Sequence, residues 1–397
     1  MAMSTVKSLA RRLLRTCVRL IPESVLIRVL PTAEKFDSSA VQQPTPALEG
    51  SVRLFIGPTN TAGQAWHWAR AAERLPGVSA RSMAAARAAR RFEFDVDQLV
   101  PAAIYRWSSS WQRAQLDSLR SFSHVMIESA RPLLGDAFGR NFKSDLVALK
   151  AASVSVALIF HGSDIRLPSR HAAASQWSPF ADASNLTTAL EQRVRAHQRL
   201  LEGVDVPIFV STPDLLLDLP AARWLPVVVD PETWKSDSAP FEHSGLPRVA
   251  HAPSQAVLKG SDLIDPILSQ LEEEGILQYE RVEQVPVGEM PSLYRNADIV
   301  IDQARLGIYG VAACEAMAAG RVVVSHVSEQ IRSHVFQETG ITLPIVEAKP
   351  DVLASTIRAI VRRPAAYLPQ ATAGIGFVNA VHDGRLAAKA LREFLGR

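Results

Sequence analysis

Residues 307–325 have the sequence GIYGVAACEAMAAGRVVVS. Two glycines precede an apolar stretch with helical spacing, and a run of β-branched residues follows it. This segment therefore predicts a glycine-containing loop, a helix from about Val311 to Ala319 and a buried strand. A strand that is apolar on both faces and directly follows a helix is typical of a parallel sheet covered by helices.

The alternation of strands and helices extends outward from this segment over most of the chain. Helical spacing recurs, for instance, from Asp262 to Glu273, and short apolar runs separate such stretches. The predicted strands are residues 52–56, 124–128, 154–162, 206–211, 224–229, 248–253, 299–302 and 321–327. These are too many for one compact sheet, and the polar, proline-rich residues 230–247 are typical of an interdomain linker. We therefore predict an α/β protein with two doubly wound, Rossmann-like domains that face each other across a cleft.

Composition excludes several classes of protein. The chain has 397 residues, of which 47% are apolar and 21% are charged, and this excludes a disordered or collagen-like chain. Cys17 and Cys314 form no CxxC motif, which argues against a disulfide scaffold or a cysteine-based zinc site and favours a reducing cytoplasm. No run approaches the roughly 18 apolar residues of a membrane span.

The net charge of +3 is concentrated at one end of the chain. Residues 1–21 contain five basic residues and no acidic one, so the rest of the chain carries a net charge of −2. A nucleic-acid-binding protein would need its basic surface on the folded body, so nucleic acid is not a predicted partner. In residues 4–21, four basic side chains recur every four positions beside an apolar stripe: Lys7, Arg11, Arg15 and Arg19. This pattern predicts either an interfacial helix on an anionic membrane surface or a helix packed on the protein itself.

Familiar phosphate and metal motifs are absent from the sequence. It contains no GxxxxGK(S/T) loop, and no GxGxxG follows the first predicted strand, which argues against a P-loop NTPase and a nicotinamide-binding site. No HExxH and no carboxylate cluster at metal-binding spacing is present, so we predict no metal site. A phosphate-bearing ligand must therefore be held by other residues.

Three segments of the C-terminal half follow one another in a specific order: residues 248–271 with LKG, residues 284–303 with LYRNAD, and residues 307–325 with EAMAAG. This order resembles the nucleotide-sugar domain of GT-B glycosyltransferases, and most of all family 4, whose retaining members use a sugar nucleotide without a metal. The similarity spans about residues 50–390. It implies the GT-B fold, a nucleoside-diphosphate sugar as donor, no cofactor, and a glycan or lipid-linked acceptor. It also implies a cytoplasmic enzyme, either soluble or peripheral on the inner face of the membrane.

The resemblance also divides the chain into segments. It implies a basic leader in residues 1–47, an acceptor-side domain in residues 48–235 and a nucleotide-sugar-binding domain in residues 236–378. Residues 379–397 would form a helix that crosses back to the N-terminal domain.

The donor site that the resemblance implies lies in the C-terminal half. Lys259, followed by Gly260 at a strand-to-helix junction, matches the family's phosphate-binding lysine, and Glu315 matches its ribose-binding glutamate. Physical chemistry agrees, because a departing nucleoside diphosphate needs fixed cations and N–H groups. A helix N-terminus preceded by glycine has such unpaired amides and a favourable dipole. The residues expected to form it are Tyr309, Gly310 and Val311.

Two departures from the family's pattern fall in the same site. The family has a glutamate, seven residues and then the ribose-binding glutamate, but this sequence has Gly307 at the first position. Ser254 stands where the family has an arginine, and we keep it as a donor-site candidate. Arg305, in the loop of Gly307, is either an electrostatic substitute or a solvated side chain. The retaining outcome and the identity of the sugar therefore stay open.

The N-terminal half supplies candidate catalytic and acceptor residues. His161 and Asp164 follow a predicted strand in IFHGSDIR, and the carboxyl ends of strands face the ligand crevice of open α/β sheets. A similar histidine in the family lies near the reacting sugar, so these two are the catalytic candidates; a hydrogen-bonded turn is the structural alternative. Arg166, with Asn60 and Gly63 in GPTNTAGQ, is a candidate for binding acceptor or phosphate.

Two other functions are compatible with this fold. Replacement of the motif glutamate at 307 and of the arginine at 254 could leave a catalytically inactive glycan-binding or scaffold protein. The same fold also occurs in nucleotide-sugar epimerases, which this sequence resembles less. Fold alone does not separate these functions.

Overall fold

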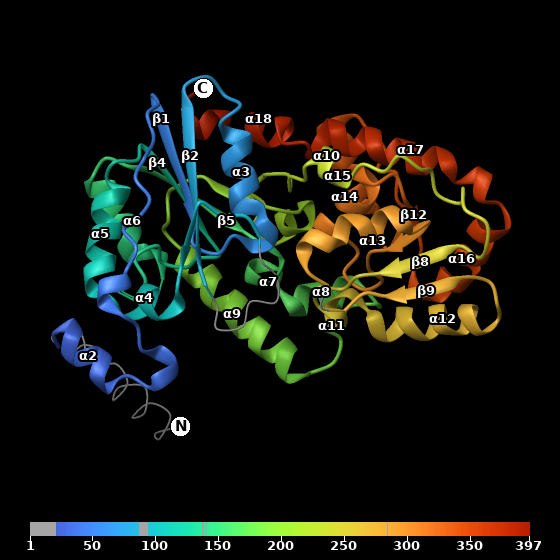
Figure 1. The fold of residues 1–397 in the computed structure, drawn as a ribbon, viewed down its shortest axis with the longest axis horizontal. Coiled ribbons are helices and arrows are strands. Elements are labelled where there is room, and N and C mark those ends of the chain that lie inside the picture. Colours follow the sequence, from blue (N-terminus) through green and yellow to red (C-terminus); the bar gives the residue numbers. More distant parts are fainter. Residues whose placement is uncertain (1–20, 87–93, 137–138, 140, 284) are drawn as a thin grey trace.

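The structure, a computed structural model, describes residues 21–86, 94–136, 139, 141–283 and 285–397. These residues form two parallel sheets surrounded by helices, and the two sheets lie side by side in Figure 1. Residues 4–20 of the predicted interfacial helix lie outside the described residues. No described helix is both long and apolar enough to cross a membrane.

The N-terminal half of the described chain contains a sheet of seven parallel strands in the order β3-β2-β1-β4-β5-β6-β7. They are β1 (Val52–Gly57), β2 (Val78–Ala85), β3 (Gln98–Val100), β4 (His124–Glu128), β5 (Ser155–Phe160), β6 (Ile208–Val210) and β7 (Arg223–Trp224). The order reverses between β1 and β4, as in a doubly wound sheet. Predicted strands at 52–56, 124–128, 154–162 and 206–211 are confirmed. The sequence does not predict β2, because alanine and serine occupy most of its buried positions.

The second sheet has five described parallel strands in the order β12-β11-β10-β8-β9. They are β8 (Arg248–His251), β9 (Gln278–Arg281), β10 (Ile299–Ile301), β11 (Val322–Ser325) and β12 (Val346–Glu347). Predicted strands at 248–253, 299–302 and 321–327 are confirmed. The sequence does not predict β9, an edge strand whose residues are mostly exposed. Two parallel α/β layers of this kind are the predicted Rossmann-like architecture, whereas the exact segment boundaries stay a prediction.

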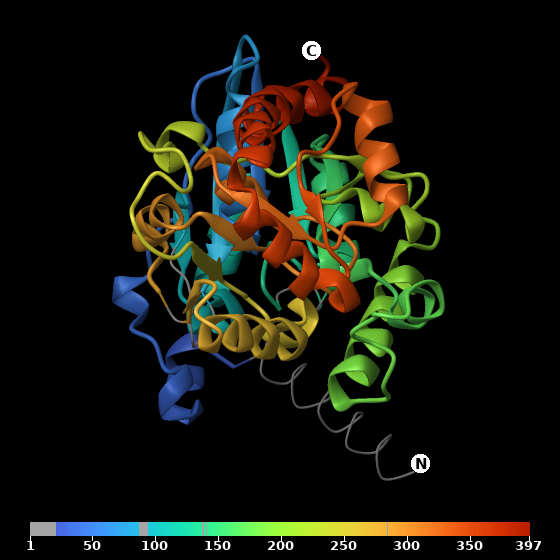
Figure 2. The ribbon, with the colours of Figure 1, turned by 90° about the vertical axis from the view of Figure 1, so that its right-hand side faces the viewer.

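Helices flank both sheets (Figures 1 and 2). Those of the first half are α2 (Glu23–Val29), α3 (Gln64–Ala72), α4 (Ala102–Trp107), α5 (Ser109–Leu119), α6 (Phe142–Ala151), α7 (Gly162–Ile165), α8 (Pro168–Ala174), α9 (Asn185–Leu201) and α10 (Pro231–Trp234). The later ones are α11 (Ala256–Lys259), α12 (Ser261–Glu273), α13 (Met290–Asn296), α14 (Val311–Ala318), α15 (Glu329–Thr339), α16 (Leu353–Arg362), α17 (Leu368–Phe377) and α18 (Arg385–Leu395). The π-helical turn η8 (Val378–His382) precedes α18. Predicted helices at 262–273 and 311–319 are confirmed as α12 and α14.

The last helix, α18, packs on the first half of the chain. Its buried residues Leu391 and Phe394 belong to the same apolar core as Leu54 of β1 and Trp68 of α3. Figure 1 shows α18 extending from the second half toward α3. The strands of the second sheet therefore come, in the sequence, between the first half of the chain and α18, although the first half and α18 share one apolar core.

The chain passes from the first sheet to the second through a buried extended segment, residues 225–229. The sequence predicts a strand over 224–229, but the ladder of the first sheet ends with β7 at Trp224. Leu225 still donates its N–H to the Val210 carbonyl of β6 at 2.9 Å, and beyond it side chains of α3 provide hydrogen bonds in place of a neighbouring strand. Gln64 exchanges two with the backbone of Val228, at 2.7 and 3.0 Å. The indole N–H of Trp68 donates to the Pro226 carbonyl at 2.9 Å.

His382, at the end of η8, holds the same segment from the other half. Its Nδ1–H donates to the Val227 carbonyl at 2.7 Å, and its carbonyl accepts from the N–H of Val229 at 2.9 Å. The hydroxyl of Tyr309 lies 3.2 Å from Nε2, which is the acceptor in this tautomer. The segment's side chains are shared between the two cores, Leu225 and Val228 in one and Val227 and Val229 in the other.

Acid should weaken this contact. Burial lowers the pKa of His382 from 6.5 to about 4. The unfolded chain therefore takes up the proton first, and stability falls as the pH drops from 6.5 through about 4. His382→Asn removes the titration and keeps an N–H for Val227. We expect the free energy of unfolding, measured in urea, to fall more in the wild type than in H382N over this pH range. Parallel curves of this free energy against pH would contradict the lowered pKa of His382.

Candidate active site

The candidate residues gather at the carboxyl ends of the strands of both sheets. In the second sheet, Lys259 follows β8 and Asp302 follows β10. In the first sheet, Asn60 follows β1 and His161 follows β5. This is the edge of an open α/β sheet at which ligands bind.

Lys259 is held at the end of β10 by a buried carboxylate. Its Nζ donates to Oδ1 of Asp302, whose side chain is 0% exposed. Gly260 adopts the left-handed conformation (φ 81°) that ends α11 and starts α12. The second oxygen of Asp302, Oδ2, is buried and accepts no hydrogen bond in the described structure.

Glu315 lies close to this ion pair, one turn into α14. Burial raises the pKa of Glu315 to about 8, against the opposing charge of Lys259 and with a further contribution from Asp302. The residue keeps a partly exposed edge. The structure therefore brings Lys259 and Glu315 together, and adds Asp302, which the sequence analysis does not single out.

The loop between β10 and α14 is shaped by Gln303. Its Nε2 donates to the carbonyls of Ile308 (2.6 Å) and His326 (2.5 Å), and its Oε1 accepts from the N–H of Leu306 (2.7 Å). Gly310 caps α14, and a Cβ there would meet nothing within 4 Å. A side chain at position 310 would therefore enter open space, next to the end of α14 at which the first amides have no partner within the helix.

The other donor-site candidates are placed differently. The side chain of Tyr309 is buried in the apolar core that contains Val227 and Val229, and its hydroxyl is bonded to His382. Of this residue, therefore, only the backbone is available to a ligand at the loop. Arg305 makes a two-point ion pair with Asp262 at 3.2 and 2.5 Å. Ser254 is exposed in the turn between β8 and α11. Gly307 has φ +67°, a left-handed conformation that glycine adopts without strain.

His161 and Asp164 form one hydrogen-bonded turn after β5. Nε2 of His161 lies 3.3 Å from Oε1 of Glu128, the last residue of β4, and the ring stacks on Trp68 with centroids 5.6 Å apart. Oδ2 of Asp164 accepts from the hydroxyl of Ser129 (2.6 Å) and from the backbone N–H of His161 (3.2 Å). Asp164 thus holds the turn through these two hydrogen bonds.

Arg166 and Gly63 have structural surroundings of their own. The Nε–H of Arg166 donates to Asp214 at 2.7 Å, and both side chains are buried. Gly63 has φ +74°, and a Cβ there would lie 3.2 Å from the ring of Phe94. The structure therefore gives Arg166 a buried partner and requires glycine, or a shift of Phe94, at position 63.

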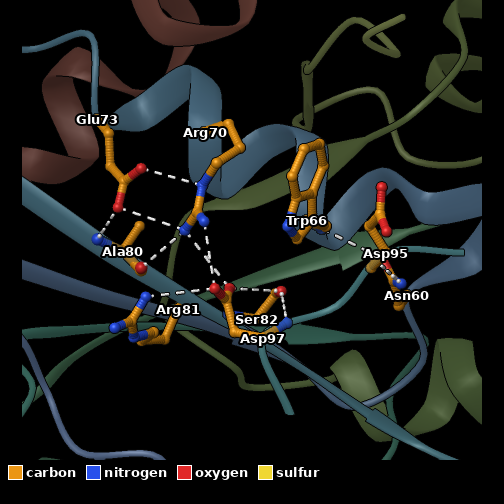
Figure 3. Close-up of polar contacts among 9 residues, drawn as sticks. All are labelled: Asn60, Trp66, Arg70, Glu73, Ala80, Arg81, Ser82, Asp95 and Asp97. Carbon is orange, nitrogen blue, oxygen red and sulfur yellow. Dashed lines mark hydrogen bonds and ion pairs between the residues drawn. The ribbon is translucent and has the colours of Figure 1, made fainter. Parts of the chain in front are cut away.

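Figure 3 shows how the loop after β1 is held. Asn60, in the left-handed conformation (φ 46°), donates from Nδ2 to the carbonyl of Asp95 (2.8 Å) and accepts from the N–H of Trp66 (3.2 Å). Asp97, which lies two residues after Asp95 and directly before β3, accepts from the N–H of Ser82 on β2 (2.7 Å). Asp97 is also paired with two guanidinium groups, those of Arg70 and Arg81. The side chain of Asn60 thus shapes the loop.

Glu128 and Asp302 are the two site residues that sequence reasoning missed. Each is a carboxylate at the end of an apolar strand run, HVMIE for Glu128 and IVID for Asp302. An acidic residue at the carboxyl end of a buried strand is therefore the signal that could have found both.

Comparison with known proteins identifies the fold. Sucrose-phosphate synthase from Thermosynechococcus elongatus has a TM-score of 0.56 and 13% identity, over 86% of this chain and 97% of that chain. Anabaena Alr3699/HepE, in complex with UDP and glucose, has a TM-score of 0.54 and 11% identity, over 86% and 98%. WaaG, a glycosyltransferase involved in lipopolysaccharide biosynthesis, has a TM-score of 0.52 and 12% identity, over 87% and 100%. The chain has the GT-B fold. No protein-family model and no curated protein sequence matches it.

The two halves of this GT-B fold touch beside the loop that precedes α14. His171 on α8 donates from Nε2 to the carbonyl of Leu306 at 3.0 Å, and its Nδ1 accepts from the hydroxyl of Ser178 at 2.7 Å. Burial lowers the pKa of His171, in keeping with this neutral form. Phe180 packs with Leu306 in the same small apolar cluster. Residues of both halves therefore hold the loop.

A surface hollow of about 550 Å³ lies elsewhere in the GT-B fold. Among its lining residues are Pro247, Ile276 and Asp298, which come shortly before β8, β9 and β10. The hollow is thus at the amino-terminal edge of the second sheet, opposite the edge that carries Lys259.

Glu315 should make the stability of the protein depend on pH. Because its pKa is raised from 4.5 to about 8, the unfolded chain loses this proton first, and stability falls as the pH rises between these values. We expect the wild type to lose stability relative to Glu315→Gln between about pH 5 and about pH 9 in chemical unfolding. Glu338→Gln, an exposed site on α15, is the control. A constant difference between wild type and E315Q would contradict the assignment.

Proposed function

We propose that the protein is a glycosyltransferase that moves a sugar from a nucleoside-diphosphate sugar to a glycan or lipid-linked acceptor. The observation that carries this proposal is the convergence of Lys259, Glu315 and the N-terminus of α14 at the carboxyl end of β10. A cation and unpaired amides are what a departing diphosphate requires, and the carboxyl group of Glu315 can hydrogen-bond ribose hydroxyls. The fold alone is weaker support, because one fold serves several functions.

The proposed donor is a UDP-sugar. HepE, which has the same fold, was solved in complex with UDP and with UDP-glucose. In our proposal Lys259 exchanges Asp302 for a phosphate of the donor, and the amides from Gly310 to Val311 bind the other phosphate. The lysine and the helix dipole meet the diphosphate charge, so the proposed transfer uses no metal. We propose retention of configuration, as in family 4, with Gly307 in place of its usual glutamate.

The proposed acceptor side is the first half of the chain. His161 stands at the carboxyl end of β5 with its ring fixed by Trp68 and Glu128. In the proposed reaction His161 contacts a hydroxyl at the reacting centre, and Asp164 keeps the turn in place. Contact between the halves, as at His171 and Leu306, aligns donor and acceptor.

Lys259→Ala tests the donor site. Loss of one charge-assisted hydrogen bond costs about 1.5 to 3 kcal/mol, so we expect the Kd for UDP to rise about 10- to 100-fold. Isothermal titration with UDP and GDP measures it. Lys349→Ala, an exposed lysine of the same half, is the matched control and should leave the Kd unchanged. Failure of the folded wild type to bind either nucleotide would contradict the donor-site proposal.

We also propose that residues 4–21 attach the protein to an anionic membrane surface, where a lipid-linked acceptor would lie. The basic stripe of this segment supports the proposal. The chain that follows is fixed to the body, because Glu23 on α2 accepts from the hydroxyl of Ser108 (3.0 Å) and from the N–H of Ser110 (2.9 Å). Val25 and Val29 of α2 are exposed.

Liposome flotation tests the attachment. We expect the full chain to float with vesicles that contain anionic lipid, and a form lacking residues 1–20 to stay at the bottom, because each basic residue near such a surface contributes about 1 kcal/mol. Neutral vesicles are the control. Equal flotation of the two forms would exclude the leader as the attachment site.

A further inference from the structure

Glu128 contacts two loops of the candidate active site through its two carboxylate oxygens. Oε2 accepts from the backbone N–H groups of Thr59 and Asn60, both at 2.8 Å. Oε1 lies 3.3 Å from Nε2 of His161. The side chain is 0% exposed, so a buried charge here depends on these donors. One residue thus joins the loop after β1 to the turn after β5.

The chemistry of these groups decides where the protons lie. Backbone N–H groups only donate, and an ionised carboxylate only accepts. An ionised Glu128 therefore places the proton of this hydrogen bond on Nε2 of His161, and Nδ1 of a neutral ring then carries the lone pair. Stacking on Trp68, at an interplanar angle of 14°, fixes the plane of the ring but not its proton.

We propose that Glu128 is a positioning residue that fixes His161 in the Nε2–H tautomer and locks it to the backbone of the loop after β1. In this tautomer the accepting atom of the ring is Nδ1, so a substrate hydroxyl that contacts His161, whose side chain is 10% exposed, would donate to that atom. This inference rests on the proposed glycosyl transfer and specifies the state in which His161 takes part. A buried carboxylate that selects the tautomer of an imidazole is a general device of enzyme sites.

Glu128→Gln separates this role from folding. A glutamine amide has one accepting oxygen and one donating NH₂ group. Because the amides of Thr59 and Asn60 can only donate, the oxygen must face them and the NH₂ group must face His161. Nε2 then has to accept, and the proton moves to Nδ1. The variant therefore keeps the loop and reverses the tautomer.

Nitrogen NMR of histidine-labelled protein measures the tautomer directly. The His161 signals are assigned with a His161→Gln variant, and no substrate is needed. We expect the proton on Nε2 in the wild type and on Nδ1 in E128Q. A wild type protonated on Nδ1 would overturn the proposal without any variant having to fold, and so would an unchanged tautomer in E128Q.

Kinetics test the consequence for catalysis. With a nucleotide sugar that the protein turns over, we expect kcat to fall about 10-fold or more in E128Q. The Kd for UDP should stay unchanged, because the donor site lies on the other half. Glu128→Asp keeps two accepting oxygens and should recover part of the rate.

Asp145→Asn is the matched control. Asp145 is also buried and also accepts from two loop amides, those of Leu133 (2.5 Å) and Leu134 (3.3 Å), but none of its described hydrogen-bond partners is a histidine. A loss of kcat in D145N equal to that in E128Q would assign the effect to loop structure and overturn the proposal.

The outcomes separate this inference from the proposed function. The expected tautomers in a protein that neither binds nor turns over any sugar nucleotide would support the positioning role and refute the proposed function. Glycosyl transfer that is equally fast in E128Q would refute the positioning role and support the function.

Discussion

The arrangement of the two sheets depends on how the buried segment 225–229 satisfies its backbone hydrogen bonds. Burying unpaired peptide groups is costly, and although Leu225 donates its N–H to the Val210 carbonyl of β6, no described strand pairs with residues 226–229. Gln64 and Trp68 from one half and His382 from the other provide the missing partners. Because the donors and acceptors come from both halves, pairing the segment also sets the position of one half against the other.

The same constraint reaches the candidate donor loop. Tyr309, next to the cap of α14, contacts His382, so the loop is connected to the crossing segment. Gln303 shapes the loop from within, and His171 contacts it from the first half. A loop held from three directions keeps the N-terminus of α14 in a fixed position, as the proposed stabilisation of a leaving diphosphate requires.

Sequence periodicity predicts helices and strands whose signal lies within a few neighbouring residues. It does not predict contacts with residues that are distant in the sequence. Strand β4 and helix α14 are found because large apolar residues recur at the right spacing. The run at 224–229 has the composition of a strand, yet the backbone of residues 226–228 is paired with side chains more than 150 residues away, which no local pattern encodes. Lys259 and Glu315 are recognisable from their motifs, whereas Asp302 and Glu128 are single acidic residues whose role comes from the fold.

The packing of α18 has a consequence for biosynthesis. The core around Leu54 and Trp68 needs Leu391 and Phe394, which are made after the whole of the second sheet. Domains usually fold in order of synthesis, N-terminal first. Here the ribosome must complete the second half before this face of the first sheet can close its core, whereas the core on the other face, around Phe55 and Phe160, needs only residues of the first half.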